Sequence, residues 1–335
     1  MSEMLAMVRD MAAQLRWAAG IDLPSVVHNR EFVVAGMGGS GIAGDYLEAV
    51  TRQDELRVTG HKDYGPLPGW VDRVRPTVIA ISYSGHTEET LDVVDDAVAR
   101  GLDVVALTAG GAIETRAQER GWPLIVVPPD LQPRAALGYL FGSALRVVGA
   151  ASGNVSYQAD LEEAAGVAET ATAEGSEGWE AAARITTGLS GKITIVYGGG
   201  PVSGAAAQRW KTQINENSKM PAWWSLLPEL DHNEIVGWES LAELTSETVA
   251  VVGLSDRSDH HRVGARFRHT RDLTAGKVSW AGEVTSWGES AAARIISLTA
   301  VGDVMSWMLA NRAGVDPLPV GTIEKLKKLL TEEEN

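Results

Sequence analysis

Apolar and polar stretches alternate along the first half of the chain at the lengths expected for strands and helices. Predicted strands lie at 32–35, 77–82, 103–108 and 124–127, and predicted helices at 42–51, 88–100 and 135–148. Short, continuously apolar strands separated by helices are typical of a parallel sheet that is buried on both faces. A helical stripe of apolar residues from Met4 to Leu15 precedes the series. The pattern therefore predicts an α/β unit with a parallel sheet.

The same pattern begins again near Lys192, where a strand runs into a glycine-rich turn at 198–201 and a helix. The second series has strands at 193–197, 248–254 and near 278–280, and helices at 158–189, 205–217, 289–313 and 323–330. A small, polar stretch at 151–154 separates the two series. We therefore predict two α/β domains of the same type, residues 1–155 and 156–335.

Composition and charge exclude several classes of function. The net charge of −15 and the pI near 4.9 argue against nucleic acid or an anionic membrane surface as a partner, since either needs a basic face. The absence of cysteine excludes disulfides and thiolate chemistry. The first 20 residues lack the features of a signal peptide, and we expect no apolar stretch of membrane-spanning length. These observations predict a cytoplasmic protein.

The turn at 36–41 (GMGGSG) follows an apolar run and opens into a helical pattern. Glycines at such a turn, here including Gly38 and Gly39, let the backbone approach an anion, and the helix N-terminus then holds it. Ser40 adds a hydroxyl. The spacing also satisfies the dinucleotide fingerprint, but the acidic residue which that function needs at the end of the second strand is missing. A sugar phosphate suits the turn better.

A second polar turn, 82–90 (SYSGHTEET), lies where the next strand ends and a helix begins. Open α/β sheets bind ligands at this position. Its candidate phosphate-binding hydroxyls are those of Ser82, Ser84 and Thr87. Thr87 alternatively caps the helix. Glu88 and Glu89 would repel a dianion, so we expect them to point away from the ligand.

Candidate acid/base groups lie farther along the chain. Glu216, near the end of a predicted helix, is either a surface glutamate or a base, and Arg134 is either solvent-exposed or the cation that stabilises an oxyanion. Removing a proton next to a carbonyl builds charge on oxygen, so base and cation must flank the same carbons. His232, in the cluster 229–234 (ELDHNE), suits acid/base chemistry better than metal binding, because spaced histidine pairs are missing.

Taken in order, these motifs resemble the bifunctional phosphoglucose/phosphomannose isomerase family, a branch of the sugar isomerase (SIS) fold. The resemblance spans nearly the whole chain. It rests on 36–45 (GMGGSGIAGD), 82–91 (SYSGHTEETL), 133–134 (PR), 215–238 (NENSKMPAWWSLLPELDHNEIVGW) and 314–317 (GVDP). Each segment is weak alone, but their joint order and separation are highly specific.

The resemblance implies two SIS domains, a homodimer, and isomerisation of glucose 6-phosphate, and of mannose 6-phosphate, to fructose 6-phosphate, with no cofactor or metal. By motif, Glu216 is similar to the base that moves a proton between C1 and C2 through a cis-enediol. Arg134 resembles the residue that stabilises that intermediate. His232 resembles the ring-opening histidine, which reaches the site from the neighbouring subunit. The residues similar to the family's substrate-binding groups are Ser40, Ser82, Ser84, Thr87 and, in the last helix, Lys327.

Two departures from the family pattern bear on substrate preference. His86 stands where asparagine is common, and 218–220 together with Trp223 and Trp224 differ from commoner forms. Two alternatives remain: a non-catalytic sugar-phosphate sensor on the same fold, and a nicotinamide-dependent oxidoreductase built on the turn at 36–41.

Overall fold

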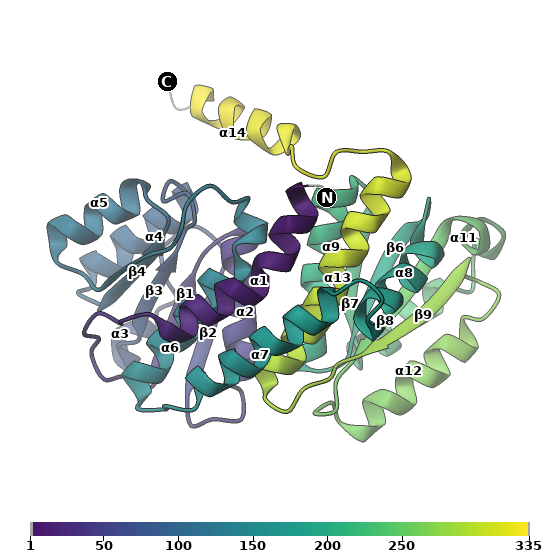
Figure 1. The fold of residues 1–335 in the computed structure, drawn as a ribbon, viewed down its shortest axis with the longest axis horizontal. Helices are drawn as coiled ribbons and strands as arrows, with labels where there is room; N and C mark the ends of the chain where they lie inside the picture. Colours follow the sequence, from purple (N-terminus) through teal and green to yellow (C-terminus); the bar gives the residue numbers. More distant parts are fainter. Residues whose placement is uncertain (1–2, 334–335) are drawn as a thin grey trace.

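Residues 3–333 are described by a computed structural model, and they form two separate parallel sheets, each flanked by helices (Figure 1). The five-stranded sheet has the order β2-β1-β3-β4-β5, and the four-stranded sheet has the order β7-β6-β8-β9. The predicted α/β class with two parallel sheets is confirmed.

The elements of the first half are α1 (Glu3–Gly20), β1 (Glu31–Ala35), α2 (Gly38–Val50), β2 (Arg57–His61), α3 (Val71–Val74), β3 (Thr77–Ile81), α4 (Glu88–Ala99), β4 (Val104–Thr108), α5 (Gly111–Arg120), β5 (Leu124–Val126), the 3₁₀ turn η1 (Pro133–Ala135) and α6 (Leu137–Ser152). The elements of the second half are α7 (Tyr157–Thr172), α8 (Glu177–Leu189), β6 (Ile193–Gly198), α9 (Pro201–Ser218), β7 (Ala222–Leu226), the 3₁₀ turn η2 (Glu229–His232), α10 (Glu234–Gly237), α11 (Ala242–Thr248), β8 (Val249–Ser255), α12 (His261–Leu273), β9 (Trp280–Thr285), α13 (Ala291–Ala313) and α14 (Gly321–Glu333).

The two sheets share one topology. In each, the second strand in sequence (β2 or β7) pairs on one side of the first strand, and the third strand (β3 or β8) pairs on the other side. The connections on either side of the first strand therefore leave in opposite directions, which opens a crevice at the carboxyl ends of the first and third strands. This repetition is why the same sequence pattern appears twice.

The buried central strands match their predicted positions, whereas two edge strands were missed. Every residue of β3 and β4 is buried, so both read as continuous apolar runs. In contrast, β2 begins with the exposed Arg57, and β7 carries Trp223, which is 58% exposed. An edge strand needs no continuous apolar run, because one side of it lacks a covering neighbour. The helix predicted over 158–189 is also two helices, α7 and α8, since Ser176 caps α8 by accepting a hydrogen bond from Trp179.

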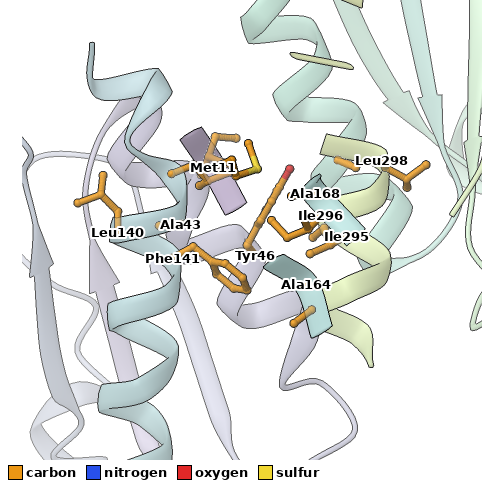
Figure 2. Close-up of a cluster of buried hydrophobic side chains, with 14 of the residues drawn as sticks. Met11, Ala43, Tyr46, Leu140, Phe141, Ala164, Ala168, Ile295, Ile296 and Leu298 are labelled. Atoms are coloured by element: carbon orange, nitrogen blue, oxygen red, sulfur yellow. The ribbon is translucent and has the colours of Figure 1, made fainter. Parts of the chain in front are cut away.

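A layer of helices joins the two sheets in one hydrophobic core. The core contains residues of α1, α2 and α6 from the first half and of α7, α9 and α13 from the second. Figure 2 shows Tyr46 of α2 pointing toward α13, with Phe141 of α6 nearby. The rings of Tyr46 and Phe141 pack edge to face, with their centroids 5.7 Å apart. The division at residue 155 remains a proposal, because α1 packs on α7 and the two halves are thus held against each other.

α13 corrects one expectation from the sequence. Its 23 residues are long and apolar enough to cross a membrane by length and composition, although no such stretch was predicted. Of its most apolar window, 89% is buried inside the protein. The apolarity of α13 thus follows from its place between α7, α8 and α9, all of which contact it.

Candidate functional site

A cavity of about 290 Å³ opens at the carboxyl ends of β1 and β3, the crevice created by the strand order of the first sheet. Four parts of the chain form its walls. Three come from the first half: the start of α2, the segment after β3 and the η1 turn. The fourth comes from the second half and consists of α9 and α14. Of the candidate site residues predicted from the sequence, those that line it are Gly38, Gly39, Ser40, Ser84, Thr87, Arg134, Glu216 and Lys327.

The first wall is the glycine turn that opens α2. Gly39 lies against the backbone of η1: a Cβ atom added at this position would be 2.9 Å from the carbonyl oxygen of Pro133 and 3.0 Å from the Cα of Arg134. Glycine is needed here because backbone atoms cannot yield as a flexible side chain can. The turn and the arginine segment are therefore held in direct contact.

We expect Gly39→Ala to push these two segments apart. Overpacking of this kind costs about 1–3 kcal/mol, so the melting temperature falls, and binding of inorganic phosphate weakens about tenfold or more, equivalent to ~1.4 kcal/mol. Calorimetry measures both effects. Gly69→Ala is the matched control, since an added Cβ there meets nothing within 4 Å. Equal behaviour of the two variants would contradict the proposed contact.

The second wall is the hydroxyl-bearing segment after β3. Ser84 and Thr87 line the cavity, but Ser82 is fully buried and does not. The Ser82 hydroxyl instead lies 2.9 Å from the Thr87 hydroxyl, and the hydrogen bond between them helps to hold Thr87 in place. Thr87 occupies the N-cap position of α4, yet its side chain makes no capping hydrogen bond. The capping interpretation of its hydroxyl is therefore wrong.

The acidic pair that follows departs from the prediction in one member. Glu88 accepts a hydrogen bond from the Tyr64 hydroxyl, outside the cavity, as expected. Glu89, which was expected to point away, lines the cavity. It lies in the first turn of α4, where the helix dipole stabilises a carboxylate wherever the side chain points. His86 is exposed and is not among the lining residues.

Arg134 is almost completely buried, at 3% exposure, so the solvent-exposed alternative is wrong. Its Nε donates to Asn217 Oδ1 at 2.7 Å, and its Nη2 donates to the carbonyl oxygens of Pro317 and Leu318 at 2.7 and 3.0 Å. Burial lowers the pKa of this guanidinium, although Glu216 opposes the shift. These bonds set a planar cation at the cavity wall in one orientation.

Glu216 lies in the last turn of α9 and brings a carboxylate from the second half of the chain to the cavity. Its Oε2 is 3.5 Å from Arg134 Nη1, and its side chain keeps 25% exposure. Negative charge is unfavourable at a helix C-terminus, and Arg134 offsets that cost. The ammonium of Lys219 donates to the carbonyl oxygens of Glu216 and Pro319, and burial lowers its pKa. The base candidate on α9 and the cation candidate on η1 thus lie 3.5 Å apart, where these two walls of the cavity meet.

His232 does not join this arrangement within one chain. It ends η2, is exposed, and does not line the cavity. The carboxylates around it have local partners: Asp231 accepts from Arg266 at 2.8 Å, and Glu234 accepts from Ser225 at 2.6 Å. Two acidic groups of the cluster 229–234, Asp231 and Glu234, therefore bond to neighbouring elements, whereas the imidazole stays exposed.

Lys327 reaches the cavity from α14, a helix in which no residue is buried. Figure 1 shows α14 projecting from the body of the protein, near the end of α13.

Gln132 was not predicted from the sequence, although it lines the cavity and accepts a hydrogen bond from Arg134 Nη1 at 3.2 Å. Its position directly before the Pro133-Arg134 motif was the available signal.

At the equivalent glycine turn of the second sheet, which borders a separate cavity of about 380 Å³, a carboxylate of the protein itself lies against the backbone. The hydroxyl of Ser203, in the first turn of α9, donates to Asp259 Oδ1 at 3.3 Å and Oδ2 at 3.1 Å. A Cβ atom added to Gly200 would lie 2.1 Å from Asp259 Oδ1, so the carboxylate rests against the glycine turn. The repeated turn of the second half is thus occupied, and the candidate site lies at the first.

Comparison with known proteins confirms the family that the sequence motifs resemble. Residues 179–330 match a family model described as the bacterial phospho-glucose isomerase C-terminal SIS domain. A bifunctional phosphoglucose/phosphomannose isomerase of Caldicellulosiruptor bescii is 40% identical over 305 residues, covering 90% of this chain and 89% of the relative. One of Aquifex aeolicus is 37% identical over 304 residues, covering 89% of each chain.

A solved structure of a hypothetical protein from Thermus thermophilus shares the fold, with a TM-score of 0.69 at 18% identity over 99% of this chain and 87% of that one. Identity this low supports the architecture alone. The level and extent of identity to the curated relatives, together with the match to the family model, show that this chain belongs to the bifunctional phosphoglucose/phosphomannose isomerase family.

Proposed function

We propose that this protein interconverts glucose 6-phosphate and fructose 6-phosphate, and that it also accepts mannose 6-phosphate. One observation carries the proposal. The Glu216 carboxylate, 3.5 Å from the Arg134 guanidinium, faces the same cavity as the hydroxyls of Ser40, Ser84 and Thr87. A base next to a fixed cation, and an anion cradle in the same cavity, are what a phosphorylated aldose–ketose isomerase needs. The names of the relatives support the choice of sugar.

The phosphate group is the anchor in this proposal. The N-terminus of α2 supplies the backbone N–H groups and the positive end of a helix dipole, and the hydroxyls of Ser84 and Thr87 add donors. Because the protein as a whole is acidic, the positive charge that binds phosphate has to come from a residue at the site, and Lys327 supplies it. Once the phosphate is fixed, C1 and C2 of the opened sugar lie at the opposite end of the cavity.

Proton transfer then needs no cofactor or metal. Glu216 removes the C2 proton of the open aldose, and the C–H electron pair becomes the C1–C2 double bond of a cis-enediol as the carbonyl oxygen takes up negative charge. Arg134 stabilises that oxygen. Glu216 returns the proton to C1, and the hydroxyl proton of O2 passes to the negatively charged O1, which leaves a ketone at C2 and a hydroxyl at C1. Because the planar intermediate has two faces, both C2 epimers can form it if the C2–C3 bond rotates.

Ring opening is assigned to His232 of a second subunit. The imidazole lies outside the cavity of its own chain, on an exposed turn that contacts β7 and α10. These two elements carry the exposed side chains of Trp223 and Val236, which are 58% and 59% exposed. An apolar, exposed surface around a polar side chain suits a contact between subunits. We therefore propose a homodimer in which each cavity is completed by its neighbour.

Mixing two inactive variants tests this arrangement. Glu216→Gln and His232→Ala are each expected to be nearly inactive as pure proteins. Co-expressed hybrids regain activity, because one of their two cavities combines an intact Glu216 with an intact His232 from the neighbour. The hybrids are purified by two different tags and assayed for fructose 6-phosphate. Hybrids as inactive as the pure variants would rule out the shared site.

The proposed function itself is tested with wild-type protein in a coupled assay that measures fructose 6-phosphate from either aldose. Turnover of both substrates is expected. A sugar-phosphate sensor would instead bind the aldoses in calorimetry and turn over neither, and an oxidoreductase would bind NADH with quenching of tryptophan fluorescence. Activity on glucose 6-phosphate with none on mannose 6-phosphate would contradict free rotation at C2–C3 while leaving the isomerase assignment intact.

A further inference from the structure

We propose that Arg209 and Asp303 are positioning residues for this isomerisation, and that their ion pair sets the place of Arg134 relative to Glu216. The inference rests on the proposed function. Arg209 belongs to α9, Asp303 to α13 and Arg134 to the η1 turn of the first half. Neither member of the pair lines the cavity, so neither is a catalytic residue.

The pair is enclosed by the surrounding helices. Arg209 and Asp303 are 1% and 2% exposed. Arg209 Nε and Nη2 donate to the two carboxylate oxygens of Asp303 at 3.2 and 2.7 Å, a bidentate arrangement. Gln213, one turn along α9, donates to the same carboxylate at 2.8 Å. Asp303 thus binds two successive turns of the helix that carries Glu216.

One further bond connects this pair to the site. Arg209 Nη2 also donates to the backbone carbonyl oxygen of Arg134 at 3.0 Å. Arg209 precedes Glu216 by seven residues on α9, which is two helical turns, so both side chains leave the same face of the helix. One face of α9 therefore holds Arg134 at two points, by its backbone through Arg209 and by its guanidinium through Glu216 at 3.5 Å.

α13 supports the other end of the same arginine. Asn217 accepts from Arg134 Nε at 2.7 Å, and its amide donates to Ser306 Oγ at 2.9 Å. Ser306 lies three residues after Asp303, on the same side of α13. α13 thus fixes the backbone of Arg134 through Asp303 and Arg209, and its guanidinium through Ser306 and Asn217.

Stability alone does not account for such a pair. Replacing a buried ion pair by apolar residues of similar volume is often neutral or stabilising, because the desolvation of both charges is avoided. What an apolar pair lacks is a directed donor for the Arg134 carbonyl. Reaction rates are sensitive to placement, since a shift of about 1 Å costs about 100-fold. Geometry between the two halves is therefore the property that Arg209 and Asp303 supply.

The test compares Asp303→Asn with the double variant Arg209→Met/Asp303→Leu in the full-length protein. For both we expect kcat to fall about 10- to 100-fold. KM and the affinity for inorganic phosphate are expected to change less, because none of the side-chain hydrogen bonds of the pair goes to the turn at 36–41, Ser84, Thr87 or Lys327. The double variant guards against misfolding, since it buries no unpaired charge, and its melting temperature is expected to lie above that of Asp303→Asn.

Asp256→Asn is the matched control. Asp256 forms another strongly buried ion pair with a residue of α13: Arg294 Nε lies 3.0 Å from Asp256 Oδ2, the two side chains are 11% and 0% exposed, and Asp256 does not line the cavity. This variant is expected to lose stability without losing kcat. A stable double variant with wild-type kcat would overturn the inference, as would equal kcat losses in Asp303→Asn and Asp256→Asn. An inactive wild type would instead overturn the proposed function first, and the inference with it.

Discussion

Glu216→Gln is expected to lower kcat for glucose 6-phosphate about a thousandfold, within the range that general-base catalysis contributes. Glutamine has nearly the same shape and keeps the oxygen that faces Arg134 at 3.5 Å, but it cannot take up the C2 proton. KM is expected to change little, because most of the proposed phosphate anchors come from the first half of the chain and not from α9. The coupled fructose 6-phosphate assay gives both constants.

Glu89→Gln is the matched control for this prediction. It makes the same change of charge on the wall of the same cavity. We expect it to keep kcat and to lower KM, since a carboxylate that repels the phosphate dianion is removed. A loss of kcat as large as that of Glu216→Gln would mean that negative charge, and not a base at one position, supports the reaction. Retention of kcat in Glu216→Gln would remove Glu216 from the mechanism.

Arg134→Lys is expected to lower kcat about 100-fold and to reduce stability as well. Lysine keeps the charge but has no planar fork, so it cannot serve Asn217 and the carbonyl groups of Pro317 and Leu318 at once. Loss of a fixed oxyanion donor costs about 100- to 1000-fold in other enzymes. Kinetics and thermal unfolding on the same preparation measure the two effects.

Arg30→Lys is the control for the stability effect of this substitution. Arg30 pairs with Glu55 at 2.9 Å on the surface, with side chains 53% and 91% exposed. Exposed pairs of this kind contribute about 0–1 kcal/mol, so both stability and kcat are expected to stay near wild type. If Arg134→Lys behaves in the same way, the guanidinium geometry is not what the reaction uses.

The parts of the fold that follow from local pattern were predictable. β3 and β4 are buried on both faces, so the chain itself must be apolar along their whole length. β2 and β7 lie at sheet edges, where most of their residues are only partly buried or exposed, and they therefore carry no such pattern. α13 is apolar enough to resemble a membrane span because other helices surround it, and only the packing reveals that reason.

The candidate site divides in the same way. The glycine turn and the hydroxyl-bearing segment are short and continuous, so their chemistry is readable in sequence. The sequence does not show whether the Ser82 hydroxyl faces the cavity or bonds to Thr87. That depends on the burial of Ser82 at the end of β3, which is a property of the packed structure. Glu89 likewise lies in the first turn of α4 and lines the cavity. Its position in the sequence does not specify which way the side chain points.

By itself, the sequence determined the α/β class, the repetition of one unit, and the residue types capable of binding a phosphate and moving a proton, because each depends on neighbours along the chain. Only the tertiary structure decided that Arg134 is buried 3.5 Å from Glu216, that Asp259 fills the second glycine turn, and that Arg209 joins α9 to the first half. These contacts link residues 56 to 82 positions apart in the chain. Such contacts form only when whole helices pack together, and the local sequence pattern does not specify that packing.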